Sequence, residues 1–520
     1  MALLSDSWLL DSLSLLTSLA IIIVISWLNW THTYWQRKGL ANPPVHFFFG
    51  NGKPLFTQQT SIGDFIKDLY DYLNIHNKPH GGIYLFSMPT YIPVDPEIVK
   101  AVMQNDFNHF VDRGVYCNEE ADPLSAHLFS LEGTKWRNLR AKLTPTFTSG
   151  KMKMMFDTLV KCGDQLTVEM DKTVGDSINI KDILARFTTD IIGNCAFGID
   201  CNSLQNPDSE FTRYLKLFFT SGFWENMVGL FTFVAPNISK KFNMKIVNPI
   251  LSKFFMKVIK DTVEYREKNN IHRKDFMHLL LQLKNRGKLV DDGSILNDKD
   301  NKGEDTALTM NELAAQAFVF FLAGFETSST TMTFCLFELA SNPDIQEKLR
   351  QEVKDILDKY DNKLTYDGVM EMHYMEKVIN ETLRKYPPVP FLNRVCTKDY
   401  HVPGTDFIIE KGTKVMIPVL GIQRDPEHYP DPEKFDPERF SEENKKTRHP
   451  YTFLPFGEGP RICIGLRFGM VQTKVGLTIL LKNYKFSLGS KTALPLKFDP
   501  KNVIMTTEGG IWLDYATIND

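Results

Sequence analysis

The segment that most constrains this chain is residues 453–465, where three glycines and two prolines surround Cys463. Glycine and proline at this density favour a tight loop whose backbone can approach a flat ligand closely. Residues 466–481 are predicted to form a helix, so Cys463 lies just before a helix N-terminus, where positive potential stabilises a thiolate. Arg461 adds a charge that can pair with a carboxylate. The pattern indicates a thiolate site, and a buried structural cysteine is the alternative.

Length and composition exclude several classes of protein. The 520 residues are ample for a large core, and 43% hydrophobic with 24% charged residues argues against disorder. The near-balance of 60 basic and 63 acidic residues gives no support for nucleic-acid binding. Seven scattered cysteines with no CxxC pair exclude a dense disulfide scaffold and the usual zinc patterns. They indicate a reducing compartment.

The N-terminus has the composition of a membrane anchor. Residues 12–36 contain no Asp, Glu, Lys or Arg, and the mostly apolar residues 13–30 would span about 27 Å as a helix. Tryptophans and a tyrosine at positions 27–35 would form an interfacial aromatic belt. Because acids precede the span and Arg37 and Lys38 follow it, the positive-inside tendency places the bulk of the chain in the cytosol.

Two other N-terminal signals do not fit this segment. A cleaved signal peptide would have a basic first region, which is missing here, and a mitochondrial transit peptide would have arginines before Arg37. We therefore predict an anchor over residues 1–36 and a proline-containing linker over 37–45, with a non-helical hinge at 42–44. A single catalytic domain is expected over residues 46–520.

The rest of the chain is predicted to be mainly α with a smaller β portion, in one large domain. Helical periodicity dominates residues 136–385, with clear examples at 344–360 and 374–386. Residues 284–305 are rich in Asp, Lys, Asn and Gly and are predicted to form an exposed loop. Prolines recur over residues 387–455, together with short strand-like runs at 407–409 and 414–417.

Residues 309–339 are predicted to form a core helix. Thr309 and Glu312 fit a capping box, and the following apolar run is too short to span a bilayer. Gly324 then costs about 1 kcal/mol relative to alanine within the helix. The stretch 323–328 is either a packing notch, with a hydroxyl bonded back to the carbonyl of residue i−4, or a ligand space with a proton path.

The cysteine loop resembles a known family. Phe456, Gly459, Arg461, Cys463 and Gly465 stand at the spacing of the haem-binding loop of cytochromes P450. Further segments resemble that family's motifs in the family's order: WxxxR at Trp136 to Arg140, the oxygen-activation motif at Ala323, Gly324, Glu326 and Thr327, ExxR at Glu381 to Arg384, and PERF at 437–440.

The resemblance implies haem b (iron protoporphyrin IX) as the cofactor and O2 as a co-substrate. Cys463 is then the axial ligand of the iron, and its electron donation favours O–O cleavage. Phe456 belongs to the haem-binding loop. The residues implied in binding the haem propionates are Trp136, Arg140, Arg394, Arg461 and, as a weaker candidate, Arg113.

Roles for other residues also follow from the resemblance. Glu381 and Arg384 would form a buried network with Arg439 that braces the cysteine loop. Thr327 and Glu326 would order water and deliver protons to dioxygen. The residues implied in lining the substrate pocket are Phe318, Phe321, Ala323, Val389 and Phe391. Aromatic residues at helical spacing are also typical of plain core, and an i, i+3 ion pair is more often solvated.

Electrons must come from a partner, because the chain has no GxGxxG or P-loop nucleotide motif. Residues 135–153 are basic and contain no acid, which is typical of a solvated face. By resemblance this stretch, with Lys135, Arg137, Arg140, Lys142, Lys151 and Lys153, docks an NADPH–cytochrome P450 reductase, with cytochrome b5 as a second partner. An apolar cluster over residues 218–234 resembles a segment that dips into the membrane, although core packing would explain it equally well.

The whole chain resembles insect microsomal P450s, which implies an endoplasmic reticulum anchor and oxidation of lipophilic foreign compounds such as plant toxins or insecticides, with electrons from NADPH through the reductase. An enzyme specific for an endogenous steroid, hormone or fatty acid is the first alternative. A haem-thiolate isomerase or dehydratase and a non-catalytic haem sensor are alternatives from other classes. Thr327 and the basic stretch argue against both of these.

Overall fold

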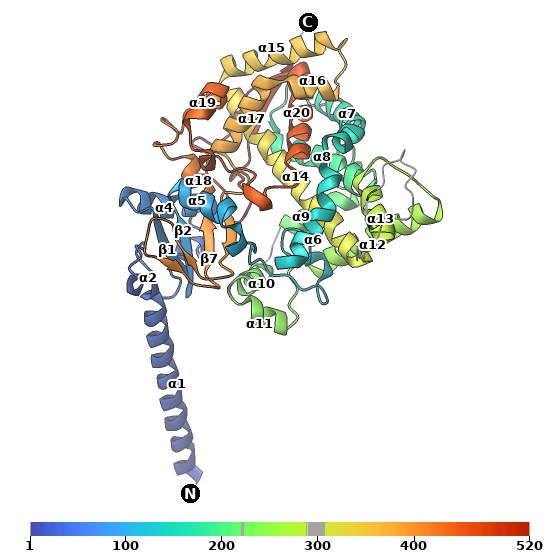
Figure 1. Cartoon of the computed structure of the whole chain (residues 1–520). Helices are drawn as coiled ribbons and strands as arrows, with labels where there is room; N and C mark the ends of the chain where they lie inside the picture. The colour runs from blue at the N-terminus through green and yellow to red at the C-terminus, as the bar shows by residue number, and fades with distance from the viewer. Residues whose placement is uncertain (1, 220–222, 288, 290–306, 519–520) are drawn as a thin grey trace.

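Helix α14 (Met310–Ser341) runs through the centre of the molecule, and other helices pack around it (Figure 1). Its start is a capping box: Thr309 Oγ1 accepts from the Glu312 backbone N–H, and the Glu312 carboxylate accepts from the Thr309 N–H. Most of its residues are buried. Both the predicted capping box and the predicted core helix are confirmed.

The computed structural model describes residues 2–219, 223–287, 289 and 307–518. The first helices and those of the central body are α1 (Ala2–His32), α2 (Tyr34–Arg37), α3 (Lys53–Phe56), α4 (Ile62–Ile75), α5 (Pro96–Lys100), α6 (Gly133–Leu143), α7 (Ser149–Asp171), α8 (Ile180–Ile192), α9 (Glu210–Phe219) and α10 (Phe223–Val234). The later helices are α11 (Pro236–Lys241), α12 (Pro249–Lys268), α13 (Phe276–Arg286), α15 (Pro343–Lys359), α16 (Tyr366–Glu371), α17 (His373–Lys385), α18 (Val419–Gln423), α19 (Glu442–Thr447) and α20 (Leu466–Asn483).

The strands form small sheets. The largest has the order β1-β2-β7-β4, with β1 (His80–Leu85), β2 (Met88–Pro93), β7 (Lys414–Ile417) and β4 (Leu392–Val395). Only β2 and β7 run parallel in it, with Thr90 opposite Lys414. A second sheet joins β3 (Ile178–Asn179), β9 (Trp512–Thr517) and β8 (Tyr484–Leu488), and β5 (Tyr400–His401) pairs with β6 (Ile408–Ile409). The mainly α architecture with a smaller β portion is confirmed.

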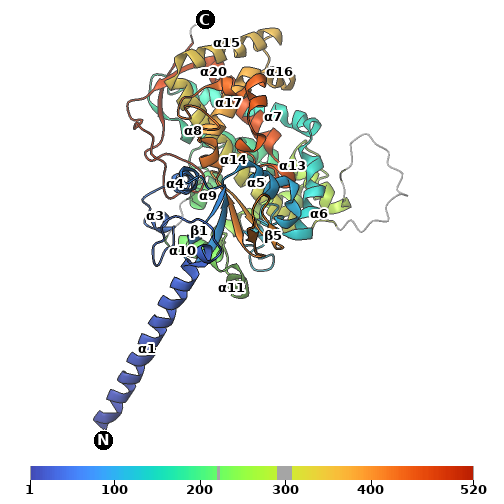
Figure 2. The same cartoon turned by 60° about the vertical axis from the view of Figure 1, so that its left-hand side comes forward.

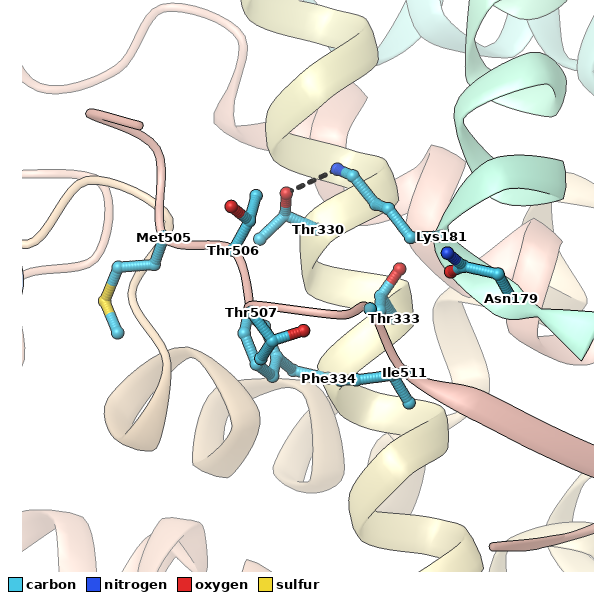
Figure 3. Close-up of a pocket in the computed structure, with 10 residues that line it drawn as sticks. Asn179, Lys181, Thr330, Thr333, Phe334, Met505, Thr506, Thr507 and Ile511 are labelled. Atoms are coloured by element: carbon cyan, nitrogen blue, oxygen red, sulfur yellow. Dashed lines mark hydrogen bonds between the residues drawn. The ribbon is translucent and has the colours of Figure 1, made fainter. Parts of the chain in front are cut away.

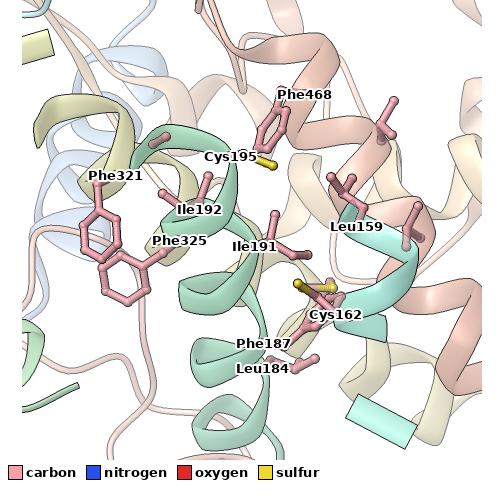
Figure 4. Close-up of a cluster of buried hydrophobic side chains, with 14 of the residues drawn as sticks. Leu159, Cys162, Leu184, Phe187, Ile191, Ile192, Cys195, Phe321, Phe325 and Phe468 are labelled. Carbon is pink, nitrogen blue, oxygen red and sulfur yellow. The ribbon is translucent and has the colours of Figure 1, made fainter. Parts of the chain in front are cut away.

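Helix α8 packs along α14, and Figure 4 shows the apolar side chains of this region. A Cβ on Gly324 would lie 2.3 Å from the Cδ1 of Ile192, so only glycine admits α8 at this distance. On the other side of α8, Phe187 and Ile191 face Leu159 and Cys162 of α7 (Figure 4). Gly324 is therefore a close-packing position between α8 and α14.

The N-terminal helix projects from the body (Figures 1 and 2). Within the described part of the chain, its segment Leu10–His32 is the one stretch long and apolar enough to cross a membrane, with a mean hydropathy of 1.9. Helix α2 follows and buries Trp35, whose Nε1 donates to the Ile83 carbonyl at 2.9 Å. Residues 41–45 are non-helical, and Asn51 Nδ2 donates to the Pro44 carbonyl at 2.9 Å. The Gly82 N–H of β1 donates to the Ala41 carbonyl at 2.9 Å, so the linker packs against the four-stranded sheet.

Most predicted elements lie where they were expected, as α14, α15, α17, α20, β6 and β7 show. The predicted loop at 284–305 begins too early, because α13 continues to Arg286 and ends at Gly287, which has a φ of +71°. That left-handed residue, rather than the first polar residue, terminates the helix. Residues 290–305 of the predicted loop lie outside the described residues.

Candidate active site

The cysteine loop is closed by its own backbone. The Cys463 N–H donates to the Phe456 carbonyl at 2.9 Å, just before α20 begins. Gly459 has a φ of +71°, and a Cβ there would lie 2.0 Å from the Met103 carbonyl oxygen. A larger residue would therefore both strain the backbone and push the loop away from its neighbour. Phe456 is half-buried against the main core.

The Cys463 thiol is exposed, yet the protein around it raises its pKa. A side chain that faces an internal space is both accessible and surrounded by protein, which explains the exposure and the raised pKa together. Burial is the largest cause of the raised pKa, while the Gly465 N–H and the charges of Arg113 and Arg140 lower it. Within the described residues the remaining cysteines are buried or half-buried. Cys463 is therefore the accessible sulfur ligand of the described chain.

Four arginines from distant segments gather around this thiol. Burial, followed by their mutual repulsion, lowers the pKa of Arg113, Arg394 and Arg461 to about 9 each. Burial also lowers the pKa of Arg140, and the Cys463 charge opposes that shift. Arg394 repels both Arg113 and Arg461, so these three side chains lie near one another.

In the part of the chain that the structure describes, these cations have no acid within ion-pair distance, and Asp112 and Glu132 act on Arg461 only from farther away. Within the described residues, Arg113, Arg394 and Arg461 form no salt bridge, and the Nε of each has no hydrogen-bond partner. Arg461 instead donates to the Leu131 carbonyl at 2.7 Å and lies 4.2 Å over the Trp136 ring. Buried charges are normally paired, so this cluster is built for an anionic group that the chain itself does not supply.

The thiol and the arginines together fit a haem. A thiolate is a ligand for haem iron, and the two propionates of a haem match a group of buried arginines without carboxylates. Trp136 and Arg140 stand four residues apart on α6, so they share the helix face that meets this group. The structure thus brings together Cys463 and the residues predicted to bind haem: Trp136, Arg140, Arg394, Arg461 and Arg113.

The ExxR pair on α17 is fully buried. Arg384 Nε and Nη2 donate to the two Glu381 carboxylate oxygens at 2.7 and 2.8 Å, a bidentate pairing. The Nε of Arg439 lies 3.4 Å from Glu381 Oε1, which also accepts from the Asp436 N–H at 3.0 Å. Arg384 further donates to the Gln423 and Pro432 carbonyls. The network ties α17 to the segment that leads into the cysteine loop.

Sequence reasoning missed Gln423 in this network. Its Nε2 donates to the carbonyls of Leu383 and Arg384, both at 3.0 Å, and its Oε1 accepts from the Leu454 N–H at 2.8 Å. Leu454 opens the cysteine loop, so Gln423 connects the loop directly to α17. A lone glutamine gives no local signal in a sequence, because its partners lie about 30 and 40 residues away.

On α14, Thr327 and Glu326 point to different surroundings. Thr327 Oγ1 donates back to the Ala323 carbonyl at 2.6 Å. Thr327 is half-buried and Ala323 is exposed, although most neighbouring positions of this helix are buried. Glu326 is buried, and its Oε1 lies 2.9 Å from Lys181 Nζ of α8. Lys181 was also missed, since nothing local in the sequence connects it to Glu326.

Two predicted pocket residues lie in the core instead. Phe318 and Phe321 are 1% and 0% exposed, and both rings pack against Phe255. They lie on the side of α14 opposite to Ala323, which explains why aromatic character alone did not distinguish core from pocket. Val389 and Phe391, before β4, are half-buried. We therefore leave Phe318 and Phe321 out of the substrate pocket.

The fold and site together define a haem-thiolate protein. In agreement, the family described as Cytochrome P450 matches residues 41–513. The chain therefore belongs to the cytochrome P450 family, whose members are haem-dependent monooxygenases that use O2.

Relatives cover nearly the whole chain. "Probable cytochrome P450 6a13" of Drosophila melanogaster is 45% identical over 94% of this chain and 95% of its own length. "Cytochrome P450 6a2" of the same species is 42% identical over 92% of this chain and 94% of its own. "Cytochrome P450 6A1" of Musca domestica is 42% identical over 98% of both chains. The chain is thus similar to insect P450s of the 6a group.

Proposed function

We propose that this monooxygenase oxidises lipophilic small molecules, foreign compounds such as plant toxins or insecticides among them. Electrons would come from NADPH through a reductase at the endoplasmic reticulum membrane. The observation that carries the proposal is the cluster of arginines without a salt bridge among the described residues, each with a buried Nε that has no hydrogen-bond partner there (Arg113, Arg394 and Arg461), beside the accessible Cys463 thiol. The likeness to insect P450s of the 6a group and the apolar surface described below support the substrate class.

Bound haem supplies an iron centre at which dioxygen is reduced and one of its atoms is inserted into the substrate. The chain's own residues hold this group in place. Cys463 would supply its thiolate sulfur as the iron ligand, and Arg113, Arg140, Arg394 and Arg461 would bind the propionates. The Glu381–Arg384–Arg439 network keeps the cysteine loop in position, as arginine forks with several fixed hydrogen bonds are suited to do.

Thr327 and Glu326 would order water and deliver protons on the side of the haem where the substrate binds. The Thr327 hydroxyl is free to accept from a water while it donates to the Ala323 carbonyl. Glu326 stands next to it on the helix, and its carboxylate can take up and release a proton. Ala323, exposed and small, leaves room for a ligand beside them. These roles are supported by the placement of the three residues on one stretch of α14.

The reductase would dock on the basic face of α6 and the start of α7. Lys135 and Arg137 are exposed on α6, the helix that also carries Trp136 and Arg140, and Lys153 is exposed on α7. Lys135 pairs with Glu119 at 2.7 Å and Lys153 with Asp367 at 2.8 Å, but these pairs are exposed and therefore weak. A cationic face of this kind steers an acidic partner.

An apolar surface would face the membrane beside the anchor. Helices α10 and α11 lie at the end of the molecule from which α1 emerges (Figures 1 and 2). The exposed apolar residues of this entrance patch are Met227, Phe231, Ile238, Phe242, Ile246 and Ile250. The side chains of Phe218, Phe219, Phe223 and Trp224, part of the predicted membrane segment, lie outside the described residues. Such a patch admits lipophilic molecules from the bilayer.

The test is reconstitution of the full-length protein with NADPH–cytochrome P450 reductase in phospholipid vesicles. A panel of lipophilic plant and synthetic compounds, with steroids and fatty acids as the comparison set, is read by product mass, NADPH consumption and hydrogen peroxide. Products one oxygen atom heavier from the foreign compounds are expected, and none with Cys463→Ala. Oxidation of the steroid or fatty-acid set alone would overturn the substrate class, and turnover that needs no reductase would overturn the electron source.

A further inference from the structure

The ammonium group of Lys181 bonds to three side chains on one turn of α14. Its Nζ lies 2.9 Å from Glu326 Oε1, and it donates to Ser329 Oγ at 2.9 Å and to Thr330 Oγ1 at 2.7 Å. All three partners belong to α14, whereas Lys181 is the second residue of α8. The side chains of Lys181 and Glu326 are 22% and 10% exposed. The ammonium therefore has a carboxylate or hydroxyl oxygen for each of its three N–H bonds.

This lysine also lines a pocket that has both polar and apolar walls. The pocket holds about 210 Å³ and lies between α14, β3 and the segment before β9. Its lining is Asn179, Lys181, Thr330, Thr333, Phe334, Met505, Thr506, Thr507, Gly510 and Ile511. Figure 3 shows Lys181 reaching from α8 to Thr330, with Thr506 and Thr507 on the other wall. Four hydroxyls, an amide and an ammonium make this pocket suitable for water, which needs room and several polar partners.

One polar atom at the pocket is left without a partner by the protein. Asn179 Oδ1 is buried and, within the described residues, accepts no hydrogen bond. A buried acceptor normally finds a partner in protein or water. The pocket thus presents an acceptor at Asn179 and an ammonium at Lys181, and Glu326 is bonded to that ammonium. Glu326 is in turn the direct neighbour of Thr327 in the chain.

We propose that Lys181 is a positioning residue for the reaction: it keeps the Glu326 carboxylate ionised and bonded to the wall of this pocket, whose water supplies protons from solvent. The proposal rests on the proposed proton-delivery role of Glu326 and Thr327. In each cycle Glu326 takes one proton from pocket water and releases it on the Thr327 side. The pocket water regains a proton from bulk solvent, so Glu326 returns to its ionised state with no net change.

The electrostatics agree with this arrangement. Burial lowers the pKa of Lys181, and the Glu326 charge and hydrogen bond counteract that shift. Without the ammonium, a buried carboxylate loses its counter-charge and favours its protonated form. A Glu326 that stays protonated cannot take up the next proton. A purely structural tie between α8 and α14 would not depend on the protonation state of Glu326.

The main variant is Lys181→Met, which keeps the length of the side chain and removes its charge. We expect haem content and the carbon monoxide spectrum to persist. Product per NADPH should fall about tenfold, less than the roughly 10²–10⁴-fold effect of losing a proton-transfer group, with more hydrogen peroxide and a larger solvent isotope effect. Lys181→Arg should largely restore the coupling of NADPH consumption to product formation. If Lys181→Met retained wild-type coupling and isotope effect, the proposal would be overturned.

A second measurement, of the protonation state of Glu326, does not depend on turnover. Infrared difference spectra of the holoprotein report the carbonyl stretch of a protonated carboxylic acid. We expect that band near neutral pH in Lys181→Met but not in wild type, and we expect Glu326→Gln to abolish it in the double variant. Its absence from Lys181→Met would show that Lys181 does not keep Glu326 ionised. If Lys181→Met failed to bind haem, Lys181→Gln would replace it in both experiments.

The chain offers a matched control on the same helix. Lys385 Nζ lies 2.8 Å from Glu338 Oε1 of α14, and both side chains are buried. Lys385→Met should lower thermal stability as Lys181→Met does, because each leaves a carboxylate without its cation. Only Lys181→Met should change coupling and the isotope effect. Equal changes in both variants would assign Lys181 a structural role and overturn the proposal.

The pocket and the role of Glu326 are tested separately. Thr333→Leu would fill the pocket with apolar volume and leave the Lys181–Glu326 pair intact, so coupling should fall while the infrared band stays absent. Unchanged coupling would exclude the pocket as the proton route. Wild-type coupling in Glu326→Gln would instead refute the proposed function of Glu326, and the infrared result would still decide whether Lys181 holds it ionised.

Discussion

At the scale of single residues, the buried arginines oppose the folding of the haem-free chain. Arg394 is 1% exposed and forms no salt bridge within the described residues. We expect Arg394→Met to stabilise the haem-free protein by about 1 kcal/mol or more, since an unsatisfied buried charge is costly. The same variant should lose haem faster, because one propionate partner is gone. Urea unfolding of the haem-free form and haem transfer to an acceptor apoprotein measure both effects.

Arg394→Lys is the control for this prediction, since it keeps the charge but not the guanidinium fork. It should leave the haem-free form about as unstable as the wild type. A haem-free Arg394→Met protein that unfolds more easily than wild type, with unchanged haem release, would contradict the assignment of Arg394 to the propionates.

Thr327 provides a second residue-scale prediction. Thr327→Ala removes one side-chain hydrogen bond to the Ala323 carbonyl, so haem content and the carbon monoxide spectrum should persist. Product per NADPH should fall and hydrogen peroxide should rise, at or below the low end of the roughly 10²–10⁴-fold range for a lost proton-transfer group, because water can partly substitute. The measurement is the amount of NADPH consumed, of product formed and of hydrogen peroxide released.

Thr331→Ala is a matched control on the next turn. Its hydroxyl donates to the Thr327 carbonyl at 2.8 Å, the same kind of back-bond within the helix. Coupling should stay at the wild-type level in this variant. Similar losses in both variants would mean that the hydroxyl of Thr327 acts only on the helix, and the packing-notch interpretation would then be sufficient.

At the scale of elements, α17 and the cysteine loop depend on one buried carboxylate. Glu381→Ala would leave Arg384 buried and uncompensated, and breaking a buried pair in this way costs about 3–5 kcal/mol. The cysteine loop should lose its support, so the yield of haem-loaded protein should fall with stability. Chemical denaturation and the ratio of haem to protein absorbance measure the two losses.

Glu438→Ala is the comparison within the neighbouring PERF segment. Glu438 pairs with Lys348 and Lys377 at 2.9 and 2.8 Å, but its side chain is 45% exposed. Exposed pairs contribute about 0–1 kcal/mol, so stability and haem loading should hardly change. Equal effects of the two substitutions would show that the buried network does not brace the loop.

At the scale of the whole molecule, the anchor and the catalytic body are joined by packing as well as by sequence. Deletion of residues 2–30 keeps Trp35 and Leu40, which are buried in the core of the small sheet. We therefore expect a folded haem protein that sediments less completely with phospholipid vesicles, with residual binding through the entrance patch. Trp35→Ala in the full chain should be more damaging, by about 3–5 kcal/mol.

A truncated protein that fails to bind haem would contradict this division of roles. So would a Trp35→Ala protein with wild-type stability. Haem absorbance of the truncated protein and circular dichroism melting of Trp35→Ala measure these two outcomes, and vesicle sedimentation measures attachment separately.

Topology gives the last prediction. Asn237, in the sequon Asn237-Ile238-Ser239, is exposed on α11, so it would accept a glycan if the body lay in the lumen. We expect none, because the charges that flank the anchor place the body in the cytosol. A mobility shift on glycosidase treatment of the membrane-derived protein would reverse the orientation. The second sequon, at Asn380, lies within α17 and is half-buried, so it is the weaker reporter.

The sequence by itself determined the features that depend on neighbouring residues. Glycine spacing around Cys463 predicted the tight loop because positive φ at Gly457 and Gly459 is a local backbone requirement. The capping box at Thr309 and the apolar span before Arg37 are local in the same sense. The order of the motifs also sufficed to recognise the family. The hairpin of β1 and β2 was not predicted, since its glycines and prolines weaken any strand pattern.

Only the tertiary structure decided which distant residues meet. Arg113, Arg140, Arg394 and Arg461 come from four separate segments, and packing alone brings their charges together. Lys181 reaches Glu326 because Gly324 lets α8 approach α14, and Phe318 and Phe321 fall into the core because they lie on the other side of that helix. Periodicity and propensity act over a few residues, whereas burial and charge depend on neighbours that only the folded chain supplies.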